Sequence, residues 1–197
     1  MIYLVIGIIA LVVIIVIVAK NSDFTGTIFE PEYKRVGRYG ETIASNIIRQ
    51  VLREDDYLFT NVSISYEGKP TELDNVVVNK YGVFIIEVKN YTGFIVGDED
   101  DYEWQKYKKT DAGNTYEKTV KNPIKQVKRQ IYILAHYLDY YETRVWVNGY
   151  AMLLHGNSPV ESAYILNSMA DIDLTIHTPG RNYLAANTVE KIKQLLY

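Results

Sequence analysis

The chain of 197 residues contains no cysteine, which excludes a disulfide framework and any metal site built on thiolates. This absence agrees with a reducing compartment without proving one. The three histidines, His136, His155 and His177, show no metal-ligand spacing with one another or with carboxylates, so each is interpreted as structural. Neither a Ser–His–Asp arrangement nor a glycine-rich phosphate loop is visible. The sequence therefore gives no support to a nucleophilic triad or a P-loop.

An excess of positive charge is also missing. Lys and Arg number 21 against 24 Asp and Glu, which gives a formal net charge of −3. This balance argues against a nucleic-acid-binding protein that relies on net charge alone. The length favours one compact domain with a short appendage, and no internal repeat is visible.

Asp, Glu, Lys, Arg and His are absent from Ile2 to Ala19, an unbroken apolar run of 18 residues. A helix rising about 1.5 Å per residue just spans a hydrocarbon core of roughly 30 Å at this length, so residues 1–20 are predicted to be a transmembrane anchor. A signal peptide is disfavoured because no basic residue precedes the run and Lys20-Asn21-Ser22 is a poor cleavage site. A buried core helix is disfavoured because the run has no polar face. The nearby Lys and Arg residues all follow the run, which predicts a cytoplasmic location for the rest of the chain.

Residues 21–36 are expected to form a polar linker to a soluble domain over residues 37–197. Gly37 to Leu52 has the periodicity of an amphipathic helix. Glu41 lies near its N-terminal end, where a carboxylate interacts favourably with the helix dipole. The apolar stripe of the predicted helix is Ile43, Ala44, Ile47, Ile48, Val51 and Leu52.

A β-hairpin is predicted in the middle of the chain. Residues 76–78 and 83–88 are β-branched and aromatic runs typical of strands, and Asn79-Lys80-Tyr81-Gly82 between them supplies turn residues. A turn centred on Lys80 and Tyr81 places Asp74 directly opposite Glu87. The hairpin therefore predicts two acids at its open end.

Two carboxylates and one ammonium are expected to converge there. Directly paired side chains share a sheet face with Cβ atoms roughly 4.5–5.5 Å apart, which applies to Asp74 and Glu87. Lys89 follows Glu87 by two residues, so it lies on the same face. Adjacent carboxylates repel unless one is protonated or a cation lies between them, and Mg²⁺ takes oxygen ligands. The alternative is an ordinary surface ion pair, worth about 0–1 kcal/mol.

These residues resemble a known family. Asp74 followed by Glu87-Val88-Lys89 resembles the D…(D/E)xK signature of the restriction-endonuclease-like nucleases. A wider pattern, from about residue 37 to residue 154, resembles their NERD (nuclease-related domain) branch. The chain departs from relatives at Glu72-Leu73, where Gln-Ile is frequent, and this leaves the carboxylate in place. The wider pattern comprises Gly40-Glu41, Leu73-Asp74, the segment from Gly82 to Tyr91, Gly93, Trp104, and Asn122-Pro123 followed by Gln126.

The resemblance implies a metal site and its chemistry. Asp74, Glu87 and the backbone carbonyl of Val88 would bind Mg²⁺, with Mn²⁺ as a substitute. Lys89 would position or help to deprotonate the attacking water and offset charge in the transition state.

Two further residues receive roles from the same resemblance. Glu41 would face the metal site and hold a water or a second metal. Gln126 would hold a water or a phosphate oxygen near the metal. From the residues alone, Gln126 is equally well explained as the border of an amphipathic helix.

A basic stretch runs from Lys106 to Arg129, with eight Lys or Arg against two acids. It is a candidate phosphate-contacting surface, and a solvated helix face and loop is the equal alternative. Within it, Asn122 and Pro123 predict a helix start. The acidic run at residues 98–101 is interpreted as a solvated loop, because it lacks the ligand spacing of a calcium loop. The predicted nucleic-acid contacts are Lys121, Lys125, Lys128 and Arg129.

Other elements are expected along the chain. Strands are predicted at residues 57–65, 94–96, 145–155 and 172–176. Gly149 indicates a bulge or close packing in the third of these strands. Asn187 and Glu190 form a capping-box-like start for a last helix.

This pattern predicts an α/β (α+β) fold with a mixed central sheet flanked by helices. The resemblance implies a restriction-endonuclease-like form of it, preceded by one N-terminal transmembrane helix. The predicted function is a membrane-anchored, Mg²⁺-dependent nuclease that hydrolyses phosphodiester bonds, in DNA rather than RNA. The alternative is a catalytically silent scaffold that binds nucleic acid or a partner at the inner membrane face.

Overall fold

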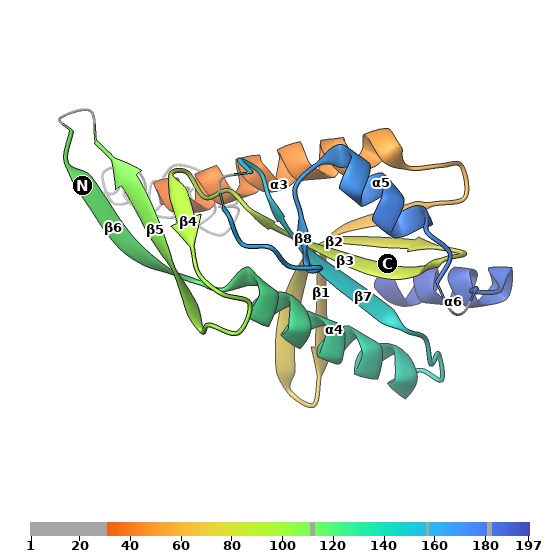
Figure 1. Cartoon of the computed structure of the whole chain (residues 1–197). Helices are drawn as coiled ribbons and strands as arrows, with labels where there is room; N and C mark the ends of the chain where they lie inside the picture. The colour runs from red at the N-terminus through yellow and green to blue at the C-terminus, as the bar shows by residue number, and fades with distance from the viewer. Residues whose placement is uncertain (1–30, 111–112, 157, 181–182) are drawn as a thin grey trace, which may run out of the picture. The chain divides into compact units, whose positions relative to one another are not determined.

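The computed structural model describes residues 31–110, 113–156, 158–180 and 183–197 (Figure 1). The predicted anchor at residues 2–19 and most of the predicted linker lie outside this part. The chain divides into two units, Met1–Arg38 and Tyr39–Tyr197. Within the described ranges, no helix is both long enough and apolar enough to cross a bilayer.

Helices and strands are mixed along the described chain. The order is α3 (Glu32–Val51), β1 (Tyr57–Tyr66), β2 (Lys69–Asn79), β3 (Gly82–Lys89), β4 (Phe94–Val96), β5 (Glu103–Lys109), β6 (Thr115–Lys121), α4 (Pro123–Tyr140), β7 (Val147–Leu153), β8 (Ile165–Leu166), α5 (Met169–His177) and α6 (Ala186–Leu196).

The described strands form two sheets. The central sheet has the order β1-β2-β3-β7-β8, antiparallel from β1 to β3 and parallel from β3 to β8. The parallel pairing of β3 with β7 requires a long crossover connection, and this connection contains α4. It also contains the antiparallel sheet β4-β5-β6, which extends away from the central strands in Figure 1.

Helices cover both faces of the central sheet. One face packs on α4 and α6, and the other packs on α5 and on residues 39–51 of α3. Side chains alternate along each strand, so Ile85 joins the first cluster and Ile86 joins the second. A strand covered on both faces has a continuous apolar sequence, as β3 does from Val83 to Ile86. The predicted mixed sheet flanked by helices is confirmed.

The predicted hairpin register is also confirmed. Asn79 pairs with Gly82, and the pairing continues to Asn75 with Ile86, so the next pair in register is Asp74 with Glu87. On the other side of β2, the β1–β2 pairing is interrupted opposite Asp74 by Asn61, which has a left-handed φ of 54°. Asp74 therefore lies where the regular β2–β3 pairing ends and where the β1–β2 pairing is interrupted for one residue.

Two local features fix α4. The Asn122 side chain accepts a 2.8 Å hydrogen bond from the backbone N–H of Ile124, which confirms the predicted cap with Pro123 behind it. Gly149 of β7 lies directly under the helix: a Cβ there would be 2.7 Å from Val127 Cγ1 and 2.8 Å from Ile131 Cγ1. Gly149 thus marks close packing, which was one of the two expected explanations.

Near the C-terminus, the predicted last helix is present as α6, but one predicted strand and the predicted capping box were wrong. Residues 172–176 belong to helix α5, in which the buried Ile172 and Ile176 are four positions apart and Ser168 is the N-cap. A short apolar run does not by itself distinguish a strand from a buried helix turn. The last helix has Ala185 at its N-cap, and Asn187 accepts a hydrogen bond only from the adjacent Thr188 N–H. The predicted capping box is therefore absent.

Two predicted elements have different boundaries, and two strands were not expected. Helix α3 begins at Glu32, five residues before the predicted start at Gly37. Strand β7 is shorter than predicted by two residues at each end. The basic stretch contains the end of strand β5 and all of β6. These strands were not predicted, because their residues are mostly polar.

Candidate active site

The candidate site is built at the open end of the β2–β3 hairpin. The backbone N–H of Val88 donates a 2.8 Å hydrogen bond to Asp74 Oδ2 across the strand pair. Lys89 Nζ lies 2.5 Å from Glu87 Oε1, so these two side chains share a face as predicted. The hairpin brings Asp74, Glu87 and Lys89 together because its register places the two acids opposite each other.

Glu87 is held by two amides from α4. Its side chain is only 2 % exposed. Gln126 Nε2 donates to Glu87 Oε1 at 2.6 Å, and Gln130 Nε2 donates to Glu87 Oε2 at 2.6 Å. The two glutamines are four positions apart, so they project from one face of the helix. With Lys89, these donors satisfy a carboxylate that would otherwise be costly to bury.

Gln130 also carries an orphaned oxygen. Its Nε2 contacts two acceptors, Glu87 Oε2 and the carbonyl of Glu72 at 3.0 Å, which fixes the orientation of the amide. Its Oε1 is buried, and no described residue donates a hydrogen bond to it. A buried acceptor without a hydrogen bond lowers the free energy of unfolding by about 1–3 kcal/mol. A donor at this position, such as an ordered water, would therefore stabilise the protein. The sequence shows the Gln126–Gln130 spacing, although no role was predicted for Gln130.

Burial and a neighbouring charge perturb Asp74. Burial, followed by the charge of Glu87, raises the pKa of Asp74 from 3.8 to about 7. The hydrogen bond from Val88 and the charge of Lys89 lower this pKa, and the charge of Glu41 raises it. The pKa of Lys89 is itself raised: burial lowers it, but the charge and hydrogen bond of Glu87 outweigh that effect. The two acids are close enough to disfavour simultaneous ionisation.

Helix α3 docks beside the two acids through buried polar contacts. Ser45 Oγ lies 2.7 Å from Asn75 Oδ1 and 2.9 Å from the carbonyl of Glu41. A Cβ on Gly40 would lie 2.7 Å from Asn90 Cβ, so only glycine lets the helix approach the end of β3 this closely. These contacts bring Glu41 within electrostatic range of Asp74.

The donor set fits a hard divalent cation. Mg²⁺ is commonly bound by one or two carboxylates while it keeps several waters, and two carboxylates converge here. Among the described residues, no group of three or more His, Asp or Glu is placed to hold a metal. Asp74 and Glu87 would therefore need backbone or water oxygens to complete a coordination shell. Burial and then the charge of Glu87 raise the pKa of Asp74, and a cation between the two acids would offset that charge.

The predicted nucleic-acid contacts on α4 already have partners. Lys128 lies 2.8 Å from Glu99 Oε1, and Lys125 lies 3.5 Å from Asp100 Oδ1. The hydrogen bond from Lys128, and then that from Ser162, lowers the pKa of Glu99. Arg129 donates to the carbonyl of Pro70 at 3.1 Å.

The acidic run at residues 98–101 is therefore more than a solvated loop. Asn122 Nδ2 donates to the carbonyls of Asp98, Glu99 and Asp101, at 3.3, 3.0 and 2.7 Å. Trp104 Nε1 adds a 2.9 Å bond to the carbonyl of Asp98. These bonds hold the loop against the start of α4, where its acids reach the lysines of the helix.

His177 forms a polar cluster away from the site. Its Nδ1 lies 2.6 Å from Asp173 Oδ1, and its Nε2 lies 2.8 Å from Asp56 Oδ2. The His177 and Asp56 side chains are 4 % and 3 % exposed. The cluster joins α5 to the turn after α3, which fits the predicted structural role of this histidine.

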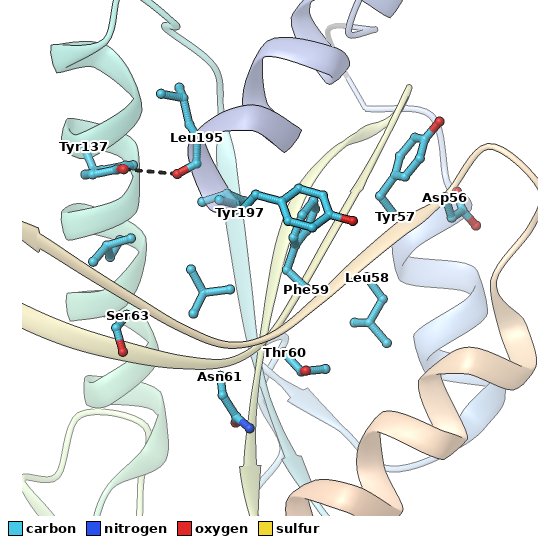
Figure 2. Close-up of a pocket in the computed structure, with 13 residues that line it drawn as sticks. Asp56, Tyr57, Leu58, Phe59, Thr60, Asn61, Ser63, Tyr137, Leu195 and Tyr197 are labelled. Atoms are coloured by element: carbon cyan, nitrogen blue, oxygen red, sulfur yellow. Dashed lines mark hydrogen bonds between the residues drawn. The ribbon is translucent and has the colours of Figure 1, made fainter.

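Two cavities lie elsewhere on the molecule. One, of about 730 Å³, is lined by residues 56–64 of β1 and its preceding turn, and by the C-terminal residues (Figure 2). There the Tyr137 hydroxyl donates to the carbonyl of Leu195 at 3.1 Å. The other, of about 1100 Å³, is lined by Tyr81, Trp146 and Tyr183 among others. Neither of these two cavities is lined by Asp74 or Glu87.

The fold is that of a mixed α/β protein whose central sheet is flanked by helices, with two acids and a lysine at the open end of a central hairpin. The profile of the NERD family, described as nuclease-related domain, matches residues 36–166, well over half of the chain. The chain therefore belongs to the NERD family, as the sequence resemblance predicted.

One curated relative is an uncharacterised protein of Bacillus anthracis, to which the chain is 32 % identical over 95 residues. The aligned segment covers 48 % of this chain and 43 % of the relative, so the match spans less than half of either protein. No solved structure gives a significant match.

Proposed function

We propose that this chain is a metal-dependent nuclease that hydrolyses phosphodiester bonds. The observation that carries the proposal is the convergence of Asp74, Glu87 and Lys89, with Glu87 buried and held by Gln126 and Gln130. Membership of a nuclease-related family supports nucleic acid as the substrate class. A mostly buried acid with a raised pKa, Asp74, beside a second acid and a lysine is an arrangement typical of a reactive site.

The metal would be Mg²⁺, with Mn²⁺ as a substitute. Asp74, Glu87 and the backbone carbonyl of Val88 would hold it. Bound there, a divalent cation supplies Lewis-acid polarisation of the phosphate and a more acidic water. Gln126 and Gln130 keep the carboxylate of Glu87 in one orientation, so its oxygens need not be reorganised during the reaction.

Lys89 and Glu41 supply the remaining functional groups. Lys89 places a positive charge 2.5 Å from Glu87, where it orients a water and stabilises charge that grows on the phosphate in the transition state. Glu41 of α3 acts electrostatically on Asp74 and would hold a water or a second metal.

The wider setting is part of the proposal. The substrate would be DNA in preference to RNA, contacted by Lys121, Lys125, Lys128 and Arg129. Contacts from Lys125 and Lys128 require their present partners, Asp100 and Glu99, to be exchanged for phosphates. Residues 2–19 would anchor the enzyme in the cell membrane with the nuclease domain in the cytoplasm.

A catalytically silent scaffold that binds nucleic acid is the second candidate. Two observations favour it: Glu87 already receives three donors, and no described group of three acids or histidines is placed around a metal position. In that case the Asp74–Glu87–Lys89 cluster would stabilise the hairpin without supporting hydrolysis.

Cleavage assays separate the two. The purified full chain is incubated with single-stranded DNA, duplex DNA and RNA, each with Mg²⁺, with Mn²⁺ or with EDTA. A nuclease cleaves only with metal, and both Asp74→Ala and Glu87→Ala abolish cleavage. Glu67→Ala, at a side chain 60 % exposed in the β1–β2 turn, is the matched control and retains full activity. A parent chain that binds nucleic acid but cleaves nothing with either metal is a scaffold.

A further inference from the structure

One face of the β5–β6 hairpin carries a concentrated positive charge. Lys106 of β5 pairs directly with Lys118 of β6, and Lys108 follows Lys106 by two residues. Directly paired residues, and residues two apart on one strand, share a face, so the three ammonium groups project together. We call this set, Lys106, Lys108 and Lys118, the lysine face.

The acids of the hairpin lie on its other face. Glu103 pairs with Lys121, and Glu117 pairs with Tyr107, whose hydroxyl lies 3.4 Å from Glu117 Oε1. Within the described part of the chain, no carboxylate oxygen is within 4 Å of the three ammonium groups of the lysine face. The hairpin thus separates charge by face, although its sequence mixes acids and lysines.

This arrangement is electrostatically unfavourable in the isolated chain. Like charges directly opposite each other destabilise a strand pair. Burial, followed by the charges of Lys108 and Lys118, lowers the pKa of Lys106. A bound polyanion relieves this repulsion, whereas the lysines on α4 are already offset by Glu99 and Asp100.

The lysine face continues from the candidate active site. At its inner end, Trp104 and Ile95 lie on the same face and are fully buried in a core cluster with α4. Lys106 Nζ lies 5.9 Å from the centre of the Tyr91 ring. Tyr91 follows Lys89 by two residues as the chain leaves β3. A ligand that reaches Lys89 can therefore extend past Tyr91 onto the lysine face.

We propose that the lysine face binds the phosphate backbone of a polynucleotide on one side of the bond to be cleaved. Only the cleavage of the bound polynucleotide at the candidate active site rests on the proposed function; binding to the lysine face does not. Lysines are point charges, and the lysine face has no Arg, Asn or Gln to read base edges in a bidentate manner. The contact is therefore independent of sequence and favours substrates long enough to span the site and the hairpin.

The test compares two triple variants of the full chain. Lys106→Gln, Lys108→Gln and Lys118→Gln together neutralise the lysine face. Lys80→Gln, Lys109→Gln and Lys191→Gln remove the same charge at exposed positions away from that face. Affinity for a duplex is measured in EDTA over a series of salt concentrations, after thermal melts show that both variants are folded. Because each phosphate contact contributes about −0.9 to the slope of log K against log salt, the first variant loses about 2–3 from the slope and the control loses none.

A parallel assay separates failure of this proposal from failure of the proposed function. With Mg²⁺, the lysine-face variant cleaves a long duplex more slowly than the parent but hydrolyses a small chromogenic phosphodiester at the parental rate. A parent that cleaves neither substrate while the slope changes as expected refutes only the nuclease. An unchanged slope overturns the lysine face, as does a parent that binds no nucleic acid. Loss of binding to anionic lipid vesicles with an unchanged nucleic-acid slope assigns the face to a membrane and also overturns the proposal.

Discussion

Gln130 and Glu87 are 43 positions apart in the chain, yet Gln130 Nε2 lies 2.6 Å from Glu87 Oε2. The contact links helix α4 to the strand that carries the candidate site. Gln126 makes the matching contact to the other oxygen of Glu87. The geometry of the site therefore depends on where α4 packs, and that position is set by the absence of a side chain at Gly149.

Replacing Gln130 with Ala is expected to destabilise the protein. It removes a hydrogen bond to a buried charged group, which typically costs about 1.5–3 kcal/mol. Urea unfolding monitored by circular dichroism measures the change. Gln50→Ala, at an exposed position of α3, is the control and is expected to stay within about 0.5 kcal/mol of the parent. Equal stability of the two variants would show that the Gln130–Glu87 contact contributes nothing.

The pH dependence of stability is expected to report on Asp74. Its pKa is about 7 in the folded protein and 3.8 as the reference value, so the folded state binds more protons between these values. Stability therefore falls as pH rises through this window. Asp74→Asn removes this loss and should be more stable than the parent at pH 8 by an amount on the order of 1–3 kcal/mol.

Thermal melts in EDTA at pH 5 and pH 8 test this expectation. The advantage of Asp74→Asn should be large at pH 8 and small at pH 5. Added Mg²⁺ should raise the melting temperature of the parent at pH 8 and leave that of the variant unchanged, because only the parent retains both carboxylates. An advantage that is independent of pH would mean that Asp74 is not perturbed in the folded protein.

Gly149→Ala is expected to affect both stability and activity. The added Cβ would lie within 3 Å of Val127 and Ile131, and overpacking of this kind costs about 1–3 kcal/mol. Displacing α4 also moves Gln126 and Gln130, so cleavage should fall further than stability alone explains. Gly180→Ala is the control, because its nearest contact would be an ordinary 3.7 Å. If Gly149→Ala is destabilised but cleaves at the parental rate, the activity of the site does not depend on how α4 packs.

His177→Leu is expected to be destabilising. It leaves the buried Asp56 without the hydrogen bond to the imidazole, and removing the partner of a buried polar group typically costs about 1–3 kcal/mol. Adding Asp56→Asn removes the uncompensated charge and should recover part of the loss. Chemical denaturation of the single and double variants measures both steps. A double variant that is less stable than His177→Leu would mean that Asp56 contributes more through its other contact, the hydrogen bond from the Arg53 N–H, than it costs without His177.

The features that could be predicted from the sequence are those set by neighbouring residues in the chain. The hairpin register follows from its turn residues and β-branched runs, and the start of α4 follows from Asn122-Pro123. The lysine-rich strands β5 and β6 were not predicted, because they have little apolar alternation and form a sheet only by pairing with each other and with β4.

Features that depend on contacts between distant parts of the chain could not be predicted from the sequence. Gln130 reaches Glu87 only because α4 packs across the sheet, and no local pattern encodes that distance. The run at 172–176 was predicted as a strand because its β-branched residues favour one, whereas the Ser168 cap and burial against α3 and the sheet select a helix.

The most direct test of the nuclease proposal is single-turnover cleavage by Lys89→Ala. The role proposed for Lys89 is to stabilise charge that appears only in the transition state, so it should affect rate more than binding. Losing one preorganised electrostatic contact typically costs about 10²–10³ in rate. Lys80→Ala, at the turn of the same hairpin, is the matched control and should cleave at the parental rate.

The measurement is the single-turnover rate with Mg²⁺, with metal and nucleic-acid affinities titrated in parallel. The predicted result for Lys89→Ala is a rate lower by about 10²–10³, with both affinities within a few-fold of the parent. A Lys89→Ala variant that cleaves as fast as the parent and as Lys80→Ala would contradict the assignment of the active site to the β2–β3 hairpin.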